Sequence, residues 1–369
     1  MTETSSHPHG DRESVPSVSR DKAADPNDFR RLYHRPPDAF IVRGDQVEGR
    51  TVAGLGPGKV MYLEADSAGR HTSKPVPKEE CGATASIVRS GPHPTEHLAP
   101  HQVHAAADLV EDLPRSVDDE LAKDPPLARF VMERIEQAGH HVWLVGGWVR
   151  DVVMHGARAR PKDLDMTGTM MSDELKAEAD RTLVDIGLGD LYTMTSKNFV
   201  YSVAPALDKP RLLEYKTVQV DGLGFPAYGG DLLDDVVCRD LTINSLYYDH
   251  RHRIIIDPSG SGIDHARARP CRLATPFRTA DPARQAAIVM RFLKFRMRLE
   301  VSDASEFERW ARELPEDMAA RIPEEAWPQL HGLWRRCVPR DHRSRAFEEG
   351  TLLGPAVAGL MDVLKRRST

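Results

Sequence analysis

The sequence predicts an α+β fold: a small mixed sheet with helices in the middle of the chain, followed by a short region made only of helices. Residues 141–145 form a strand-like apolar run that ends at Gly146 and Gly147, and a helical pattern begins directly afterwards near Trp148. Further strand and helix patterns mix up to about residue 300, and only helical patterns follow. We therefore expect a largely disordered tail in residues 1–122, a head domain in 123–270, and a helical neck with a truncated body in 271–369.

The individual elements follow from hydrophobic periodicity. Apolar residues from Leu127 to Ile135 recur at helical spacing, and Gly139 ends that helix. Besides the strand at 141–145, apolar runs predict strands at 199–203, 212–220 and 254–256. Helices are expected at 173–186, 281–299, 306–314, 324–337 and 355–365.

The N-terminal region is rich in proline, glycine, serine, histidine and charge. Its apolar residues occur only in short groups, such as 40–42 and 60–63. Groups of this size bury too little surface to offset the conformational entropy that is lost on folding. This is why we expect the first 122 residues to form a largely disordered tail.

Composition limits the classes of function. The net charge of −6 argues against a protein that coats nucleic acid non-specifically, so any RNA contact must come from a local basic patch. The four cysteines lie far apart without a CxxC pair, which favours a reducing compartment over a disulfide framework or a zinc site. No apolar run has the length of a membrane span, and we expect a cytoplasmic protein that does not contact membranes.

The sharpest chemical signal is the glycine pair followed by two aspartates. Gly146 and Gly147 lie between a strand and a helix, where the backbone can approach a phosphate closely. Asp163 and Asp165 alternate in a short strand-like segment, so their carboxylates project from one face. Paired carboxylates on one face are typical of a two-Mg²⁺ site for phosphoryl transfer.

This order of motifs resembles the class II tRNA nucleotidyltransferase and bacterial poly(A) polymerase family, whose head domain is polymerase β-like. The resemblance covers roughly residues 125–300. It implies that Asp163 and Asp165 hold two catalytic Mg²⁺ ions and that ATP or CTP is the substrate. It also implies a third acidic group on a later strand, for which Glu214 is the candidate; a surface salt bridge is the alternative for Glu214. The glycine motif of the family is matched by Gly146, Gly147, Val149, Arg150 and Asp151.

A second segment, residues 238–249, is similar to the nucleotide-binding Arg-Arg-Asp motif of the same family. The resemblance implies that Arg239 holds the triphosphate and that Asp240 and Asn244 bond ribose hydroxyls. A buried polar pair that opens a helix is the alternative for the last two. Cys238 replaces the first arginine of the motif, which weakens triphosphate binding or leaves it to Lys162 or Arg150.

A third segment resembles the element that selects bases without a template. Asp281 and Arg284 are three residues apart on one helix face, where a carboxylate and a guanidinium fit the edge of cytosine or adenine. An ordinary helix start with proline in its first turn is the alternative. Ala280 and Ala287 depart from the family pattern. Further along the helix, a basic strip is a candidate for RNA contact or a solvated face: Arg291, Lys294 and Arg298.

These features predict a templateless nucleotidyltransferase that moves a nucleoside monophosphate from ATP or CTP to an RNA 3′-hydroxyl, as in tRNA CCA addition or poly(A) synthesis. The short region after residue 300 leaves the acceptor open. The first alternative is nucleotidylation of a small molecule or a protein. The second is a catalytically inactive protein that binds nucleotide or RNA.

Overall fold

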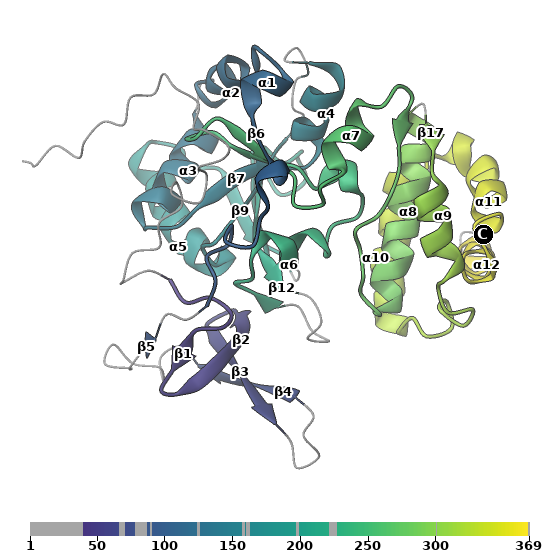
Figure 1. The fold of residues 1–369 in the computed structure, drawn as a ribbon, viewed down its shortest axis with the longest axis horizontal. Coiled ribbons are helices and arrows are strands. Elements are labelled where there is room, and N and C mark those ends of the chain that lie inside the picture. The colour runs from purple at the N-terminus through teal and green to yellow at the C-terminus, as the bar shows by residue number, and fades with distance from the viewer. Residues whose placement is uncertain are drawn as a thin grey trace, which may run out of the picture.

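The computed structural model describes residues 40–65, 71–77, 87–88, 91–123, 126–156, 159, 163–196, 199–220, 227–299 and 301–367. Figure 1 shows a central head, strands β1–β4 that protrude from one side of it, and helices α8–α12 packed on another side. Among the described residues no helix is both long and apolar enough to span a bilayer. The part of the expected tail in residues 1–39 lies outside the described residues.

An eight-stranded mixed sheet forms the centre of the head. Only β8 and β11 run parallel in it, and the other neighbours pair antiparallel. This arrangement confirms the predicted α+β fold class with a mixed sheet, and all four predicted strand regions lie in strands. In spatial order the strands are β6 (Val103–Ala105), β15 (Ile254–Ile256), β14 (Tyr247–Asp249), β7 (Val142–Val145), β8 (Leu164–Gly168), β11 (Leu213–Thr217), β10 (Val200–Ala204) and β9 (Tyr192–Thr195).

The two faces of this sheet have different coverings. Alternate residues such as Leu144, Met166 and Tyr215 pack into the large core, together with residues of α2 (Leu113–Leu121), α3 (Leu127–Gln137), α4 (Gly147–His155) and α5 (Ser172–Asp185). On the opposite face, Trp143 and Tyr247 pack with Leu98 and Leu232 in a smaller cluster. The second face is also the one on which Asp165 lies, because Asp165 alternates with Met166.

The expectation that residues up to about 122 form a disordered tail is wrong for the described part of this region. A second sheet contains β1 (Gln46–Val47), β2 (Arg50–Gly56), β3 (Lys59–Ala65), β4 (His71–Pro77) and β5 (Ile87–Val88), and it is extended by β12 (Gln219–Val220) and β13 (Ala227–Tyr228). Residues 103–121 add β6, α1 (Ala106–Leu109) and α2 to the head. The physical reason is that distant residues complete the core: Val52 and Tyr62 are buried in a cluster that includes Met171 and Tyr228.

The region after residue 271 is helical, as predicted, apart from a short two-stranded sheet of β16 (Cys271–Arg272) and β17 (Val301–Asp303). Its helices are α8 (Pro282–Arg298), α9 (Ser305–Arg312), α10 (Trp327–Cys337), α11 (Arg343–Thr351) and α12 (Pro355–Arg367). Before them, α6 (Leu232–Val236) and α7 (Gly262–Arg267) belong to the head.

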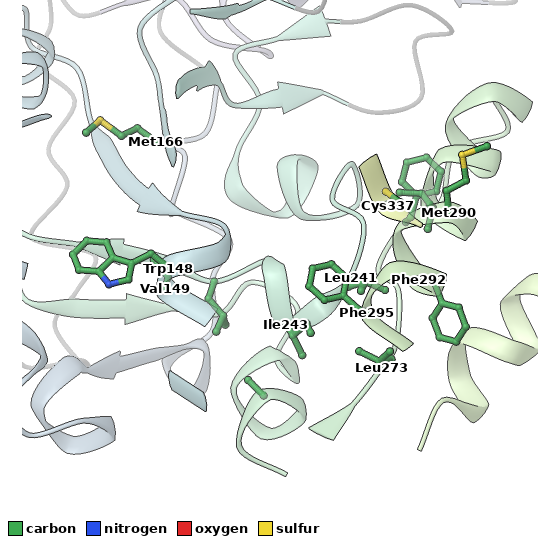
Figure 2. Close-up of a cluster of buried hydrophobic side chains, with 14 of the residues drawn as sticks. Trp148, Val149, Met166, Leu241, Ile243, Leu273, Met290, Phe292, Phe295 and Cys337 are labelled. Atoms are coloured by element: carbon green, nitrogen blue, oxygen red, sulfur yellow. The ribbon is translucent and has the colours of Figure 1, made fainter. Parts of the chain in front are cut away.

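The head and the helical region share one hydrophobic core. Figure 2 shows side chains of this cluster extending from Trp148 and Met166 in the head, through Ile243, to Phe292 and Phe295 on α8. The predicted apolar stripe of α8 is therefore confirmed, and it packs against the head as well as against its own helices. This shared core fixes α8 relative to the sheet that carries Asp165.

Candidate active site

Asp163 and Asp165 lie at the start of β8. Asp165 is inside the strand and half-buried, whereas Asp163 directly precedes the strand and is exposed. Burial and the neighbouring Asp163 carboxylate raise the pKa of Asp165 to about 6. The two carboxylates are thus within electrostatic reach of each other, as the sequence predicted.

Gly146 packs directly against the Asp165 carboxylate. It is the N-cap of α4 with φ +80°, a conformation that favours glycine. A Cβ at this position would lie 2.5 Å from Asp165 Oδ2. The glycine turn therefore places the free backbone N–H groups at the start of α4 next to the paired aspartates.

Glu214, the predicted third acid, is the direct register neighbour of Asp165 across the parallel strands β8 and β11. Its carboxylate, however, forms an ion pair with Arg211 and accepts a hydrogen bond of 3.4 Å from Ser202 Oγ. The position matches the prediction, but the side chain has the salt-bridge partner that was the alternative. A catalytic role for Glu214 stays a prediction.

Three arginines from separate segments act electrostatically on Asp165: Arg239, Arg291 and Arg150. Arg239 is held by Asp235, a residue of α6 that the sequence did not single out. Asp235 Oδ2 accepts from Arg239 Nε at 2.9 Å and from the Tyr247 hydroxyl at 2.5 Å. Burial acts to raise the pKa of Asp235, but Arg239, Tyr247 and the Gln219 N–H outweigh burial and lower it. Asp235 therefore remains a carboxylate that positions Arg239.

Arg150 and Arg291 are joined by a chain of hydrogen bonds through Asn244 and Asp240. Arg150 Nη1 donates to Asn244 Oδ1 at 2.7 Å, Asn244 Nδ2 donates to Asp240 Oδ1 at 3.0 Å, and Arg291 Nη1 donates to Asp240 Oδ2 at 2.9 Å. Asp240 and Asn244 thus form the buried polar pair that was the alternative to ribose binding. Asp151 accepts from Arg150 Nε at 2.7 Å.

The residues predicted on α8 have different environments. Asp281 caps the helix, since its Oδ1 accepts from the N–H of Ala283 at 2.9 Å, which matches the ordinary helix start that was the alternative to base selection. Arg284 is half-buried and acts electrostatically on Lys216 and Tyr228 of the head. Base selection by Asp281 and Arg284 therefore stays a prediction.

One residue of the predicted basic strip, Arg298, lines a cavity between α4 and the C-terminal end of α8. Arg291 is tied to Asp240, whereas Lys294 lies over the Phe295 ring at 5.3 Å and Arg298 is exposed. The cavity has a volume of about 400 Å³ and is lined by Arg150, Asp151, His155, Ala159, Phe295, Arg298 and Leu299. Cations thus line a hollow that adjoins the arginines around Asp165. Lys162 lies outside the described residues.

Lys216 is a second site residue that sequence reasoning missed. It lies on β11 two residues after Glu214, so it faces the same side of the sheet. Burial, Arg239 and Arg284 lower the pKa of Lys216 to about 8, although Asp235 opposes them. A lysine in an otherwise largely apolar predicted strand was the signal that could have revealed it.

The carboxylates fit a magnesium ion that is bound together with a substrate. Mg²⁺ prefers oxygen ligands and is often held by one or two carboxylates plus substrate phosphates. Burial and the Asp163 carboxylate raise the pKa of Asp165, and a divalent cation beside the two carboxylates would oppose both effects. Among the described residues no group of three or more potential metal-binding side chains is present.

Comparisons with known proteins find a family and relatives that resemble the head of the molecule. Residues 142–272 match the family model of the poly(A) polymerase head domain. Poly(A) polymerase I of Salmonella typhi is 26% identical over 276 residues, which are 69% of this chain and 52% of that protein. Poly(A) polymerase I of Escherichia coli O157:H7 is 25% identical over 276 residues, with the same coverage. The chain spans about half the length of these curated relatives.

Solved structures with some likeness are CCA-adding enzymes. The enzyme of Bacillus stearothermophilus in complex with CTP is 20% identical, with 62% of this chain and 52% of that chain covered and a TM-score of 0.44. A CCA-adding enzyme complex with ATP is 17% identical, with 69% and 54% covered and a TM-score of 0.49. Residues 142–272 therefore match a poly(A) polymerase head domain, and the chain is distantly similar to bacterial poly(A) polymerase I.

Proposed function

We propose that this protein is a templateless nucleotidyltransferase that moves a nucleoside monophosphate from ATP or CTP to the 3′-hydroxyl of an RNA. One observation supports this proposal most strongly. The paired Asp163 and Asp165 lie beside the glycine turn at Gly146, and arginines from three segments act on the same Asp165 carboxylate. Nucleotidyl transfer requires negatively charged side chains that bind the metal and positively charged groups that bind the phosphates.

The two aspartates would hold Mg²⁺, and each other site group has a separate task. Bound magnesium would lower the pKa of the attacking hydroxyl and stabilise the negative charge of the leaving pyrophosphate. Arg239, fixed in direction by Asp235, provides a guanidinium for the phosphates. The N–H groups at the start of α4 donate to phosphate oxygens. These groups are held before substrate binds, so little reorganisation is needed during the reaction.

The acceptor would approach along the cavity between α4 and α8. Arg150 and Arg298 line that cavity and would contact the phosphates of an RNA strand. The helix start with Asp281 and Arg284 is where we place contacts with the base of the incoming nucleotide. A short RNA with a free 3′ end therefore fits this part of the molecule.

A single assay tests the proposal. The purified chain is incubated with Mg²⁺, one labelled nucleoside triphosphate at a time, and an RNA that ends in a 3′-hydroxyl. We expect pyrophosphate release and extension of the RNA, with ATP or CTP preferred over UTP and GTP. The matched control is the same RNA with a 3′-deoxy end, which should accept no label.

The remaining results of this assay select the alternatives. Label that reaches only the protein or a small molecule in a metabolite extract would replace the RNA acceptor by one of those classes. Nucleotide binding without pyrophosphate release, with any acceptor, would mean a binding protein without catalytic activity.

Replacing Gly146 with alanine should reduce nucleotide transfer by about 100-fold, because the new Cβ would push the Asp165 carboxylate out of position. Gly156→Ala is the matched control. Gly156 has a similar φ of +85° but no atom within 4 Å of an added Cβ, so it carries the same backbone strain without the contact. Initial rates and thermal melts of both variants separate the two effects. Equal losses of activity would show that the contact with Asp165 is unimportant.

A further inference from the structure

Lys216 is a half-buried cation on β11, two residues after Glu214. On β11, Leu213 and Tyr215 point into the large core, so Glu214 and Lys216 lie on the opposite face. The register places Glu214 beside Asp165 and Lys216 beside Thr167. Lys216 therefore shares a face with Asp165, one side-chain position further along the sheet.

The surroundings of Lys216 contain more positive than negative charge. Its Nζ donates to Gln219 Oε1 at 2.6 Å, which is a neutral partner. The charged groups that act on it are the carboxylate of Asp235 and the guanidinium groups of Arg239 and Arg284. Asp235 is already paired with Arg239 at 2.8 Å. Among the groups named here, no carboxylate is paired with Lys216 or with Arg284. The two side chains therefore leave an excess of positive charge in a half-buried region.

A concentration of like charge away from water is unfavourable unless an anion binds there. The charges also continue toward the aspartate pair, because Arg239 acts on both Lys216 and Asp165. If the triphosphate begins beside the carboxylates of Asp163 and Asp165 and extends past Arg239, its terminal phosphate would lie near Lys216. Lysine suits the end of such a chain, because its ammonium is a compact charge with three donors.

We propose that Lys216 binds the terminal phosphates of the nucleoside triphosphate next to Arg239, with Arg284 adding positive potential from α8. This assignment rests on the proposed function, since it names a contact of the same nucleotide site. It also accounts for Cys238, which stands where the resembled motif has an arginine. Lys216 is within electrostatic reach of the Cys238 sulfur, so a cation from β11 is available near that position.

The test compares ligands that differ in phosphate number. Binding of ATP, AMP and inorganic tripolyphosphate to the full chain is measured by titration calorimetry for the wild type, Lys216→Met, Lys216→Gln and Lys216→Arg. Lys209→Met is the control, because Lys209 is an exposed lysine. We expect both neutral variants to bind ATP and tripolyphosphate about tenfold more weakly, as for one lost charge-assisted hydrogen bond. AMP binding should be unchanged, and Lys216→Arg should retain most of the affinity.

Several results would overturn the assignment. One is that properly folded Lys216→Met and Lys216→Gln bind ATP and tripolyphosphate as tightly as the wild type. Another is that the affinity for AMP falls as much as the affinity for ATP, which would place Lys216 near the base or ribose. A wild-type chain without affinity for ATP and tripolyphosphate would also overturn it. Transfer activity is read separately: a wild type that binds ATP as expected but never extends RNA contradicts the proposed function and leaves the Lys216 result standing.

Discussion

Replacing Asp165 with asparagine should abolish nucleotide transfer and at the same time make the metal-free protein more stable. Loss of the carboxylate removes a ligand of the catalytic magnesium, and we expect at least about a 1000-fold lower rate. Asp190→Asn is the control for the removal of an exposed carboxylate. Transfer assays at saturating Mg²⁺ and triphosphate measure the first effect. Activity within tenfold of the wild type would move the reaction away from Asp165.

The gain in stability follows from the raised pKa of Asp165. The folded state, with a pKa of about 6, binds more protons than the unfolded state, with 3.8, between these two pH values. The stability of the wild type therefore falls as the pH rises through this window, and asparagine does not titrate. At pH 7 the free energy of unfolding of the variant should be higher by about 1–3 kcal/mol, a difference that vanishes below about pH 4.

Urea unfolding in EDTA at pH 4, 5, 6 and 7 measures this difference. Magnesium with ATP should then stabilise the wild type more than the variant, since a ligand stabilises a folded state according to how tightly that state binds it. A variant that is less stable than the wild type at pH 7 would show that the Asp165 carboxylate is well compensated without metal.

Replacing Asp235 with alanine should lower the free energy of unfolding by about 3–5 kcal/mol, because it leaves the Arg239 guanidinium half-buried without its partner. The change also removes the acceptor of the Tyr247 hydroxyl and of the Gln219 N–H at 2.8 Å. Equilibrium unfolding in urea measures the loss. It is expected to exceed the loss from any exposed aspartate, such as Asp190→Ala.

A double variant shows whether the unpaired charge is the cause. Asp235→Ala combined with Arg239→Met should recover part of the lost stability, because both members of the ion pair are then absent. Double-variant losses equal to the sum of the single losses would contradict this explanation. Transfer activity should stay low in Asp235→Ala, in Arg239→Met and in the double variant, because none of the three has a positioned Arg239.

The parts of the site that are contiguous in sequence were the most predictable. The turn at Gly146 and the alternating Asp163 and Asp165 depend on local backbone geometry, so their positions follow from a few neighbouring residues. The family resemblance gave Glu214 as a candidate on a later strand, and the structure places it beside Asp165. Its pairing with Arg211 depends on side-chain direction, which the sequence pattern does not contain. The functional roles of these residues stay predictions.

Residues that act through long-range packing could not be predicted. Asp235 becomes important only because α6 lies against the sheet and brings its carboxylate to Arg239 and Tyr247. The strands before residue 88 were missed for a similar reason. Their short apolar groups are too small to form a core alone, and Met171 and Tyr228, far along the chain, complete it.

The hydrophobic cluster that runs from the sheet to the C-terminal helices has a mechanical consequence. Ile243 of the head and Phe292 of α8 belong to the same packed interior. Rotation of the helical region as a rigid body would have to break that interior. The distance between Asp165 and Arg291 on α8 is therefore set by the packing of the core. If the proposed function is correct, this fixed distance would limit the size of the nucleotide that the site accepts.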